Sequence, residues 1–460
     1  MKIFKRGFFM ELGRDKRVQE IIDRDKKVIS SASRMPYFPF VIKKGEGATM
    51  YDVNGKKYID FLSSAAALNT GHCHPKVVEA INYQIHKFLN YTSAYMYYEN
   101  MVELAEELIR ITPGSYFKKV SFGLTGSDAN DGAIKLARVF TGRQKIISFL
   151  RSYHGSTYGA LSLSAISLNM RKKLGPFLPE IYHIPFPDCY RCPLNHRYPE
   201  CQLACLEYFK MLLKNLIPPE EIAAIIIEPI QGDAGIIVPP DSYLFNLKKI
   251  CAEKGILFIA EEVQTGFGRT GKWFSVEHWN IEPDIILLGK GIASGMPLSS
   301  IIAKQEIMDS WQAPAHLFTM GANPVSCAAS LATIEVIKEE NLVDNTQRMG
   351  HYIKKRLLEL KARHEIIGDI RGKGLLIGVD LVKNRDTKER AVKETAKICW
   401  RCYERGLILT FLSQSVLRIA PPLNIKKEEV DHALEIIEKS IEDLENGKIP
   451  DQVLENICGW

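Results

Sequence analysis

Three short apolar runs constrain the fold of this chain more than any other feature of its sequence. They span residues 223–227, 256–260 and 285–288, and each consists of apolar residues alone. Between them lie segments in which apolar residues recur at helical spacing. Such runs are typical of strands that are buried on both faces of a parallel sheet. The sequence therefore predicts an α/β protein whose sheet is mainly parallel.

Other parts of the chain indicate further elements. An Asn54-Gly55 pair predicts a hairpin turn within residues 51–61. The spacing of apolar residues predicts helices over 75–88 and 325–340, and hairpin-like strands near 374–381 and 416–419.

These elements divide the chain into three predicted segments. Residues 1–75 form the N-terminal part of a small domain, residues 76–325 form a large cofactor-binding domain, and residues 326–460 complete the small domain. We expect the N-terminal hairpin to join the C-terminal segment in space.

Charge and composition limit the possible partners. The 60 basic and 54 acidic residues nearly cancel and form no long basic run, so we expect no nucleic-acid partner. No stretch approaches the ~20 apolar residues that cross a bilayer, so we expect no membrane span. The start, MKIFKRGFFM, is a poor secretory signal, and ten cysteines are few for a disulfide framework. We therefore expect a cytoplasmic protein.

Each of the three apolar runs is followed by an ionisable residue, namely Glu228, Glu261 and Lys290. The carboxyl ends of parallel strands meet at one edge of a sheet, where α/β proteins bind ligands. Each residue taken alone could simply begin a solvated loop, but three together favour a reaction centre. Lys290 also lies between two glycines, and a partly desolvated lysine loses its proton more readily. A neutral amine is what a Schiff base with an aldehyde requires.

A glycine turn at Gly126-Ser127 lies between a predicted strand at 120–122 and a predicted helix that runs to Arg138. Free N–H groups and the helix dipole at such a turn bind phosphate. A turn that merely caps a helix is the alternative. Beside a Schiff-base lysine, the turn is the expected phosphate anchor of pyridoxal 5′-phosphate (PLP).

Two segments carry a resemblance to a known family. They read IAEEVQTGFGRTG over 259–271 and GKGIASGMPLS over 289–299, and they resemble the class III aminotransferases of PLP fold type I. Further motifs follow in the same order along nearly the whole chain. The resemblance implies an α/β fold with a large domain around a mainly parallel seven-stranded sheet and a smaller α/β domain from both termini. It also implies an amino-acid substrate and a homodimer, or a dimer of dimers, with shared active sites.

The resemblance also implies which residues contact the cofactor. Each would hold a different part of PLP: Lys290 the aldehyde, Glu261 the pyridine nitrogen, Gln264 the phenolic oxygen, Tyr153 the ring face, and Gly126 and Ser127 the phosphate, helped by Thr319 from the neighbouring subunit. The family normally has aspartate where this chain has Glu261. One extra methylene keeps the charge, so we expect the role to survive.

For the substrate, the resemblance implies that Arg418 clamps the carboxylate and that Glu228 gates this arginine. The 4-aminobutyrate aminotransferases carry an arginine where this chain has Ser156, which weakens that substrate preference. The segments 152–159, 167–170, 293–298 and 313–319 are instead similar to isoleucine 2-epimerase and related broad amino-acid racemases.

We therefore predict a racemase or epimerase that abstracts and returns the α-proton. Racemisation needs a proton donor on each face of the substrate. Lys290 serves one face, and the sequence does not identify the other. An aminotransferase that passes the amino group to a keto acid is the main alternative. A PLP-binding protein without catalysis and a metal-organised interaction protein are two others.

Four cysteines follow the pattern C-x2-C-x8-C-x3-C, namely Cys189, Cys192, Cys201 and Cys205. Thiolates at such spacing are candidate ligands for zinc or an iron–sulfur cluster. Structural thiols, or disulfides as in a thermophile, are the alternatives, and we predict no metal in the catalytic site.

Overall fold

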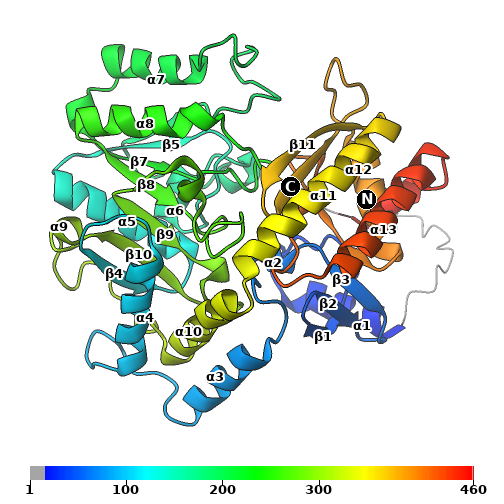
Figure 1. The fold of residues 1–460 in the computed structure, drawn as a ribbon, viewed down its shortest axis with the longest axis horizontal. Helices are drawn as coiled ribbons and strands as arrows, with labels where there is room; N and C mark the ends of the chain where they lie inside the picture. Colours follow the sequence, from blue (N-terminus) through cyan, green and yellow to red (C-terminus); the bar gives the residue numbers. More distant parts are fainter. Residues whose placement is uncertain (1–15, 458, 460) are drawn as a thin grey trace, which may run out of the picture.

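A computed structural model describes residues 16–457 and 459 of the chain. Figure 1 shows two parts: a large one around a twisted sheet, and a smaller one in which the blue N-terminal strands lie beside the orange and red C-terminal elements. Within the described residues, no helix combines the length and apolar character that crossing a bilayer requires. The opening segment MKIFKRGFFM, on which the expectation about a secretory signal rests, lies outside the described residues.

The large sheet has seven strands in the order β4-β10-β9-β8-β7-β5-β6. Its strands are β4 Lys118–Gly123, β5 Lys145–Phe149, β6 Ile181–Ile184, β7 Ile222–Ile227, β8 Leu257–Glu261, β9 Ile285–Leu288 and β10 Ser299–Lys304. Only β10 runs antiparallel to its neighbours, β4 and β9. The prediction of a mainly parallel, seven-stranded sheet is therefore confirmed.

Both faces of this sheet are buried, as the apolar runs predict. Ile226 and Ile259 pack on one face with the helix α5, Gly126–Thr141, while Ile225 and Phe258 pack on the other face with α8, Asp241–Lys254. Successive side chains of a strand point to opposite faces, so a run without polar residues is needed to fill both layers. The other helices of this part are α3 Pro75–Ile85, α4 Glu99–Ile111, α6 Tyr158–Leu163, α7 Ala204–Asn215, α9 Gln305–Met308 and α10 Pro324–Glu339.

The smaller part contains two four-stranded sheets, β1-β2-β3-β13 and β11-β12-β15-β14. Their strands are β1 Ile42–Glu46, β2 Thr49–Asp52, β3 Lys57–Asp60, β11 Ile367–Lys373, β12 Leu376–Leu381, β13 Leu407–Ile408, β14 Thr410–Leu412 and β15 Val416–Ile419. The β2–β3 hairpin turns at Gly55, whose φ is 84°. β13 pairs in parallel with β3, which confirms that the N-terminal hairpin joins the C-terminal segment.

Helices cover these smaller sheets and connect them to the large part. They are α1 Lys16–Val28, α2 Ser63–Ala66, α11 Leu342–Arg363, α12 Val392–Glu404 and α13 Lys427–Glu445. The predicted helices over 75–88 and 325–340 are confirmed as α3 and α10. α10 packs against α3, where Lys76 pairs with Glu339, and against α4, where Asn100 donates to the Pro324 carbonyl. The predicted domain limits at 75 and 325 remain predictions.

Candidate active site

The ends of β7, β8 and β9 bring three predicted residues to one edge of the large sheet. Glu228 follows β7, Glu261 ends β8, and Lys290 opens a short 3-10 helix just after β9. The three strands are adjacent and parallel, with Ile227 opposite Ala260 and Glu261 opposite Leu287. The next strand, β5, ends at Phe149 and leads to Tyr153. The site is therefore built from consecutive strand ends, which is where α/β sheets bind ligands.

Lys290 has an amine without a partner. No hydrogen bond or ion pair to Nζ occurs among the residues that the structure describes, and the side chain is half-buried. Its backbone adopts φ 44°, a left-handed conformation that non-glycine residues rarely take and that is concentrated at functional sites. A Cβ on the preceding Gly289 would lie 3.2 Å from Val263 Cγ1 and 3.3 Å from the Gly126 amide nitrogen. The lysine segment and the glycine turn are therefore in close contact.

The glycine turn forms the N-terminus of α5. Thr125 caps this helix: its Oγ1 accepts from the Asp128 amide at 3.3 Å, and Asp128 Oδ2 accepts from the Thr125 amide at 2.8 Å. The first N–H groups of a helix have no acceptor within it, so those of Gly126 and Ser127 are available to an anion. A Cβ at Gly126 would lie 2.8 Å from Val263 Cγ1. Glycine is thus required here for space.

Glu261 is buried and holds two contacts. Its Oε2 lies 3.2 Å from His154 Nδ1, and its Oε1 accepts from the Val263 amide at 2.8 Å. His154 Nε2 is buried without a hydrogen-bond partner among the described residues. The sequence analysis gave His154 no role, although it stands next to Tyr153. Its distance from Glu261 along the chain hid this pairing.

The neighbouring Glu262 serves a different purpose. Its carboxylate accepts from the Ser275 hydroxyl and the Val276 amide, both at 2.8 Å. Because successive residues at a strand end point in opposite directions, only Glu261 faces His154. Glu262 therefore stabilises the fold of the loop after β8.

Glu228 does not contact Arg418. Its Oε1 accepts from the Tyr153 amide at 3.1 Å and its Oε2 from the Gly232 amide at 2.9 Å. Burial, followed by the nearby charge of Glu261, raises the pKa of Glu228 well above its ordinary value. Both Glu228 oxygens therefore accept from backbone N–H groups of the loops around the strand end, and the gating of Arg418 by Glu228 remains a prediction.

The carboxylate beside Arg418 is Asp233. Arg418 lies on β15, is 5% exposed, and places Nη1 3.1 Å from Asp233 Oδ1. Its Nη2 makes a long contact of 3.5 Å with Thr410 Oγ1, and its Nε is buried without a partner among the described residues. The sequence analysis missed Asp233. The sequence feature that could have indicated Asp233 is its position, because it is a second acidic residue five positions after Glu228 on the same loop.

The remaining predicted residues differ in their surroundings. Gln264 is buried, and its Oε1 has no hydrogen-bond partner among the described residues. Tyr153 is half-buried. Thr319 lies on an exposed segment, and its carbonyl accepts from Asn90 Nδ2 at 3.3 Å. In the described part of the chain, no hydrogen bond or ion pair joins Thr319 to the strand-end residues.

These features fit a cofactor that carries both a phosphate and an aldehyde. The Lys290 amine is free to react, and the Gly126 turn offers N–H groups in a space that a Cβ would close. The buried Gln264 Oε1 lacks the partner that a buried polar atom normally has. Fold and site together are typical of an α/β enzyme that uses a phosphorylated aldehyde as its cofactor.

The chain belongs to the family described as Aminotransferase class-III, which matches residues 30–441. A leucine/methionine racemase from Thermococcus litoralis is 46% identical over 444 residues, or 96% of this chain and 100% of the racemase. An isoleucine 2-epimerase from Lentilactobacillus buchneri is 45% identical over 450 residues, or 98% and 100%. The structure of a Bacillus anthracis aminotransferase has a TM-score of 0.86 and 32% identity, covering 93% of this chain and 99% of that one. The predicted family is confirmed.

The four clustered cysteines line one small cavity together with His196. All nine described cysteines are free thiols. Burial raises the pKa of Cys189 to about 11 and that of Cys205 to about 12, so both thiols are protonated at neutral pH. In residues 16–457 and 459, no three His, Cys, Asp or Glu side chains are arranged to hold a metal ion.

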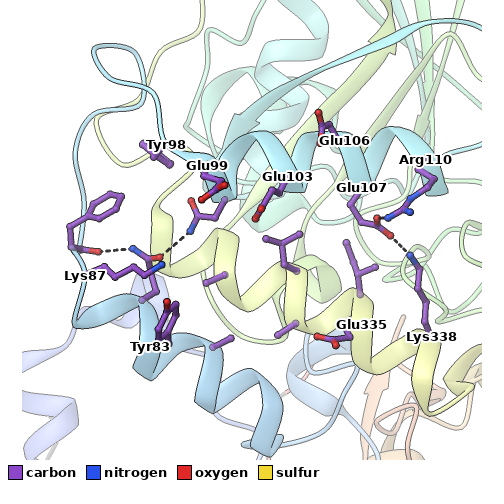
Figure 2. Close-up of a pocket in the computed structure, with 18 residues that line it drawn as sticks. Tyr83, Lys87, Tyr98, Glu99, Glu103, Glu106, Glu107, Arg110, Glu335 and Lys338 are labelled. Carbon is purple, nitrogen blue, oxygen red and sulfur yellow. Dashed lines mark hydrogen bonds and ion pairs between the residues drawn. The ribbon is translucent and has the colours of Figure 1, made fainter.

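A cleft of about 990 Å³ lies between α3, α4 and α10, away from the strand ends. Figure 2 shows Glu99, Glu103 and Glu106 of α4 along one wall and Tyr83 on another. None of the predicted site residues lines this cleft. It is therefore separate from the candidate active site.

Proposed function

We propose that this protein is a PLP-dependent amino-acid racemase or epimerase, which removes the α-proton of an amino acid and returns it to the same carbon. The observation that carries the proposal is the unpartnered Lys290 amine at the sheet edge, where the preceding Gly289 lies against the N-terminus of α5. The similarity to a leucine/methionine racemase and an isoleucine 2-epimerase over almost the full chain supports this choice within the family.

The cofactor is PLP, and several residues have suitable chemistry to hold it. Lys290 would bind its aldehyde, the amides of Gly126 and Ser127 its phosphate, Gln264 its phenolic oxygen, and Glu261 its ring nitrogen. When bound, PLP supplies an electron sink that stabilises negative charge at the α-carbon of the substrate. His154 would orient the Glu261 carboxylate, since the two side chains lie 3.2 Å apart.

Arg418 would bind the substrate carboxylate. Asp233 contacts only Nη1, Nη2 makes only the long contact of 3.5 Å with Thr410 Oγ1, and Nε has no partner among the described residues, so the edge formed by Nη2 and Nε would serve a bidentate carboxylate. Arg418 lies on β15 of a small-domain sheet, and Lys290 lies just after β9 of the large sheet. The amino acid would therefore be held between the two parts of the chain, with its α-carbon near Lys290.

Lys290 would move the α-proton as a general base and acid. Inversion requires a second donor on the opposite face. An aminotransferase is the second candidate function, which the family and the Bacillus anthracis structure favour. Ser156 weakens the 4-aminobutyrate version of this alternative, because a hydroxyl cannot replace the guanidinium fork that grips a second carboxylate.

The two functions separate in a deuterium-exchange experiment. The holoenzyme is incubated with L-leucine in D2O without any keto acid. A racemase incorporates deuterium at the α-carbon over many turnovers while optical rotation decays. D-Leucine is the matched control and should approach the same mixture from the other side. Turnover that depends on a keto acid and keeps chirality would exclude the racemase.

We also propose a homodimer, or a dimer of dimers, in which Thr319 of one subunit helps to hold the phosphate of the other. Support comes from apolar side chains on two neighbouring segments, 88–98 and 317–320. Asn90 donates to the Thr319 carbonyl and Ser93 to the Gly321 carbonyl, so the segments are tied together. The exposed side chains include Tyr95 at 71%, Tyr97 at 96% and Met320 at 50%. Such a patch favours a protein interface.

The oligomeric state is testable by sedimentation. A catalytically competent monomer would contradict the shared site.

We propose a cytoplasmic location, which the free thiols support.

A further inference from the structure

The segment of residues 187–205, here called the cysteine loop, contributes two charged side chains to the contact between the two parts of the chain. Asp188 is 4% exposed and Arg191 is half-buried. Asp188 Oδ1 accepts from the Arg191 amide at 3.0 Å, which fixes the two residues relative to each other. Two chains of hydrogen bonds and ion pairs connect these two residues with the proposed carboxylate site; they are called the first and the second route below.

The first route runs through Arg151, which follows β5. Arg151 Nη1 lies 2.8 Å from Asp188 Oδ2, and its Nη2 donates to the Ala234 carbonyl at 2.5 Å. Ser413 Oγ also donates to the Ala234 carbonyl, at 2.7 Å. Ala234 directly follows Asp233, the partner of Arg418. The cysteine loop is therefore one side chain away from the turn that carries Asp233.

The second route runs through the small domain. Arg191 forms a two-pronged pair with Asp380 on β12, at 3.0 Å for Nε–Oδ2 and 2.8 Å for Nη2–Oδ1. Arg371 lies 3.4 Å from the same carboxylate and donates from Nε to the Gly235 carbonyl at 2.9 Å. Burial opposes ionisation of Asp380, but Arg191 and Arg371 hold its pKa below the ordinary value. Both routes thus end on the turn of residues 233–235.

This turn and Arg418 are fixed on both sides. Gly235 has φ 112°, and a Cβ there would lie 3.1 Å from both Arg371 Nη2 and Val416 Cγ2. β12 pairs with β15, with Gly378 opposite Arg418 and Asp380 opposite Val416. The carboxylate that orients Arg418 and the strand that carries Arg418 therefore share one network of arginines and aspartates.

We propose that Asp188 and Arg191 of the cysteine loop are positioning residues, which act through Arg151 and Arg371 to hold Asp233 against Arg418 and so prepare Arg418 for the substrate carboxylate. The inference rests on the proposed function, in which Arg418 binds that carboxylate. It gives the cysteine loop a role that requires no metal. An arginine that is already held in one rotamer loses less conformational entropy when it binds a carboxylate.

The test measures binding of two probes to the holoenzyme by calorimetry. The first probe, 4-methylpentanoate, has the carboxylate and an apolar chain but no amine. The second, 3-methylbutylamine, has the amine but no carboxylate. Asp188→Asn and Arg191→Met should each weaken binding of 4-methylpentanoate by about three- to tenfold. Binding of 3-methylbutylamine should change by less than about twofold. Arg191→Lys, which keeps the charge but not the fork, should fall between wild type and Arg191→Met.

Lys439→Met is the matched control, because Lys439 pairs with Glu435 on the exposed face of α13 and has no contact with the network. Unchanged carboxylate binding in both loop variants would overturn the inference, and so would equal weakening of both probes. If Asp188→Asn does not fold, the two Arg191 variants decide. The two proposals can fail separately. If wild type does not exchange deuterium but Arg191→Met still binds 4-methylpentanoate more weakly than wild type does, the proposed function is refuted and the positioning role stands.

Discussion

Substitution of Gly126 by alanine should weaken cofactor binding by an amount that the structure sets. The new Cβ would lie 2.8 Å from Val263 Cγ1 and 3.0 Å from Cγ2, whereas ordinary contact begins at 3.4 Å. The overlap is with a short branched side chain beside the Lys290 segment, so relief requires the turn or the loop after β8 to move. Overpacking of this kind costs about 1–3 kcal/mol. If the turn can move aside only when PLP is absent, this cost is felt only by the bound state, and the affinity for PLP falls by roughly 5- to 150-fold.

The assay is a PLP titration of apoenzyme, followed by absorbance, for wild type, Gly126→Ala, Val263→Ala and the double variant. Removing the valine methyl groups should restore most of the lost affinity in the double variant, because the overlap then disappears. Gly175→Ala is the control, since a Cβ there meets nothing within 4 Å. Wild-type affinity in Gly126→Ala, or no recovery in the double variant, would refute the argument from space.

Three further predictions follow from the site and its surroundings. Lys290→Ala should lose α-proton exchange by about 100-fold or more and should carry no cofactor mass on its peptides after borohydride reduction; a labelled peptide in this variant would contradict the role of the amine. Arg418→Gln should lower kcat/KM for amino acids by at least about tenfold, because a charged hydrogen bond is lost, and an unchanged value would show that the carboxylate binds elsewhere. Burial and the charge of Lys373 lower the pKa of His278 from 6.5 to about 4. The neutral His278 therefore contributes fully to the free energy of unfolding of wild type above pH 6.5, and this contribution should decline as the pH falls toward 4. In urea denaturation at these pH values, His278→Gln should lose less stability than wild type over the same range; identical pH profiles would mean that His278 is not the group responsible.

Four strands of the large sheet, predicted near 120–122, 223–227, 256–260 and 285–288, and the position of Lys290 at a strand end follow from local pattern. A run such as residues 223–227 has no polar residue to place on a solvent face, so it fits only a strand with helices on both sides. The hairpin at Asn54-Gly55 and the helix at 75–88 likewise depend on residues that are neighbours in sequence. These elements are confirmed by β7, by the β2–β3 pair and by α3.

The contacts around the site depend on residues that are far apart in sequence. His154 and Glu261 are 107 positions apart, and Asp233 and Arg418 are 185 apart. Nothing in the local pattern of either member indicates its partner. The gating of Arg418 by Glu228 was implied by the family resemblance and stays a prediction, while the structure shows the Glu228 oxygens accepting from the Tyr153 and Gly232 amides.

By itself, the sequence determined the parallel sheet, the lysine at a strand end and the glycine turn of α5, since each depends on residue types within a few positions. Only the tertiary structure decided which carboxylate contacts His154 and which contacts Arg418. It also decided that the cysteine loop is linked through side chains to the turn beside Arg418. Side-chain pairing is set by how strands order in the sheet and how the two parts of the chain pack. Those distances are fixed by the whole core rather than by any one segment.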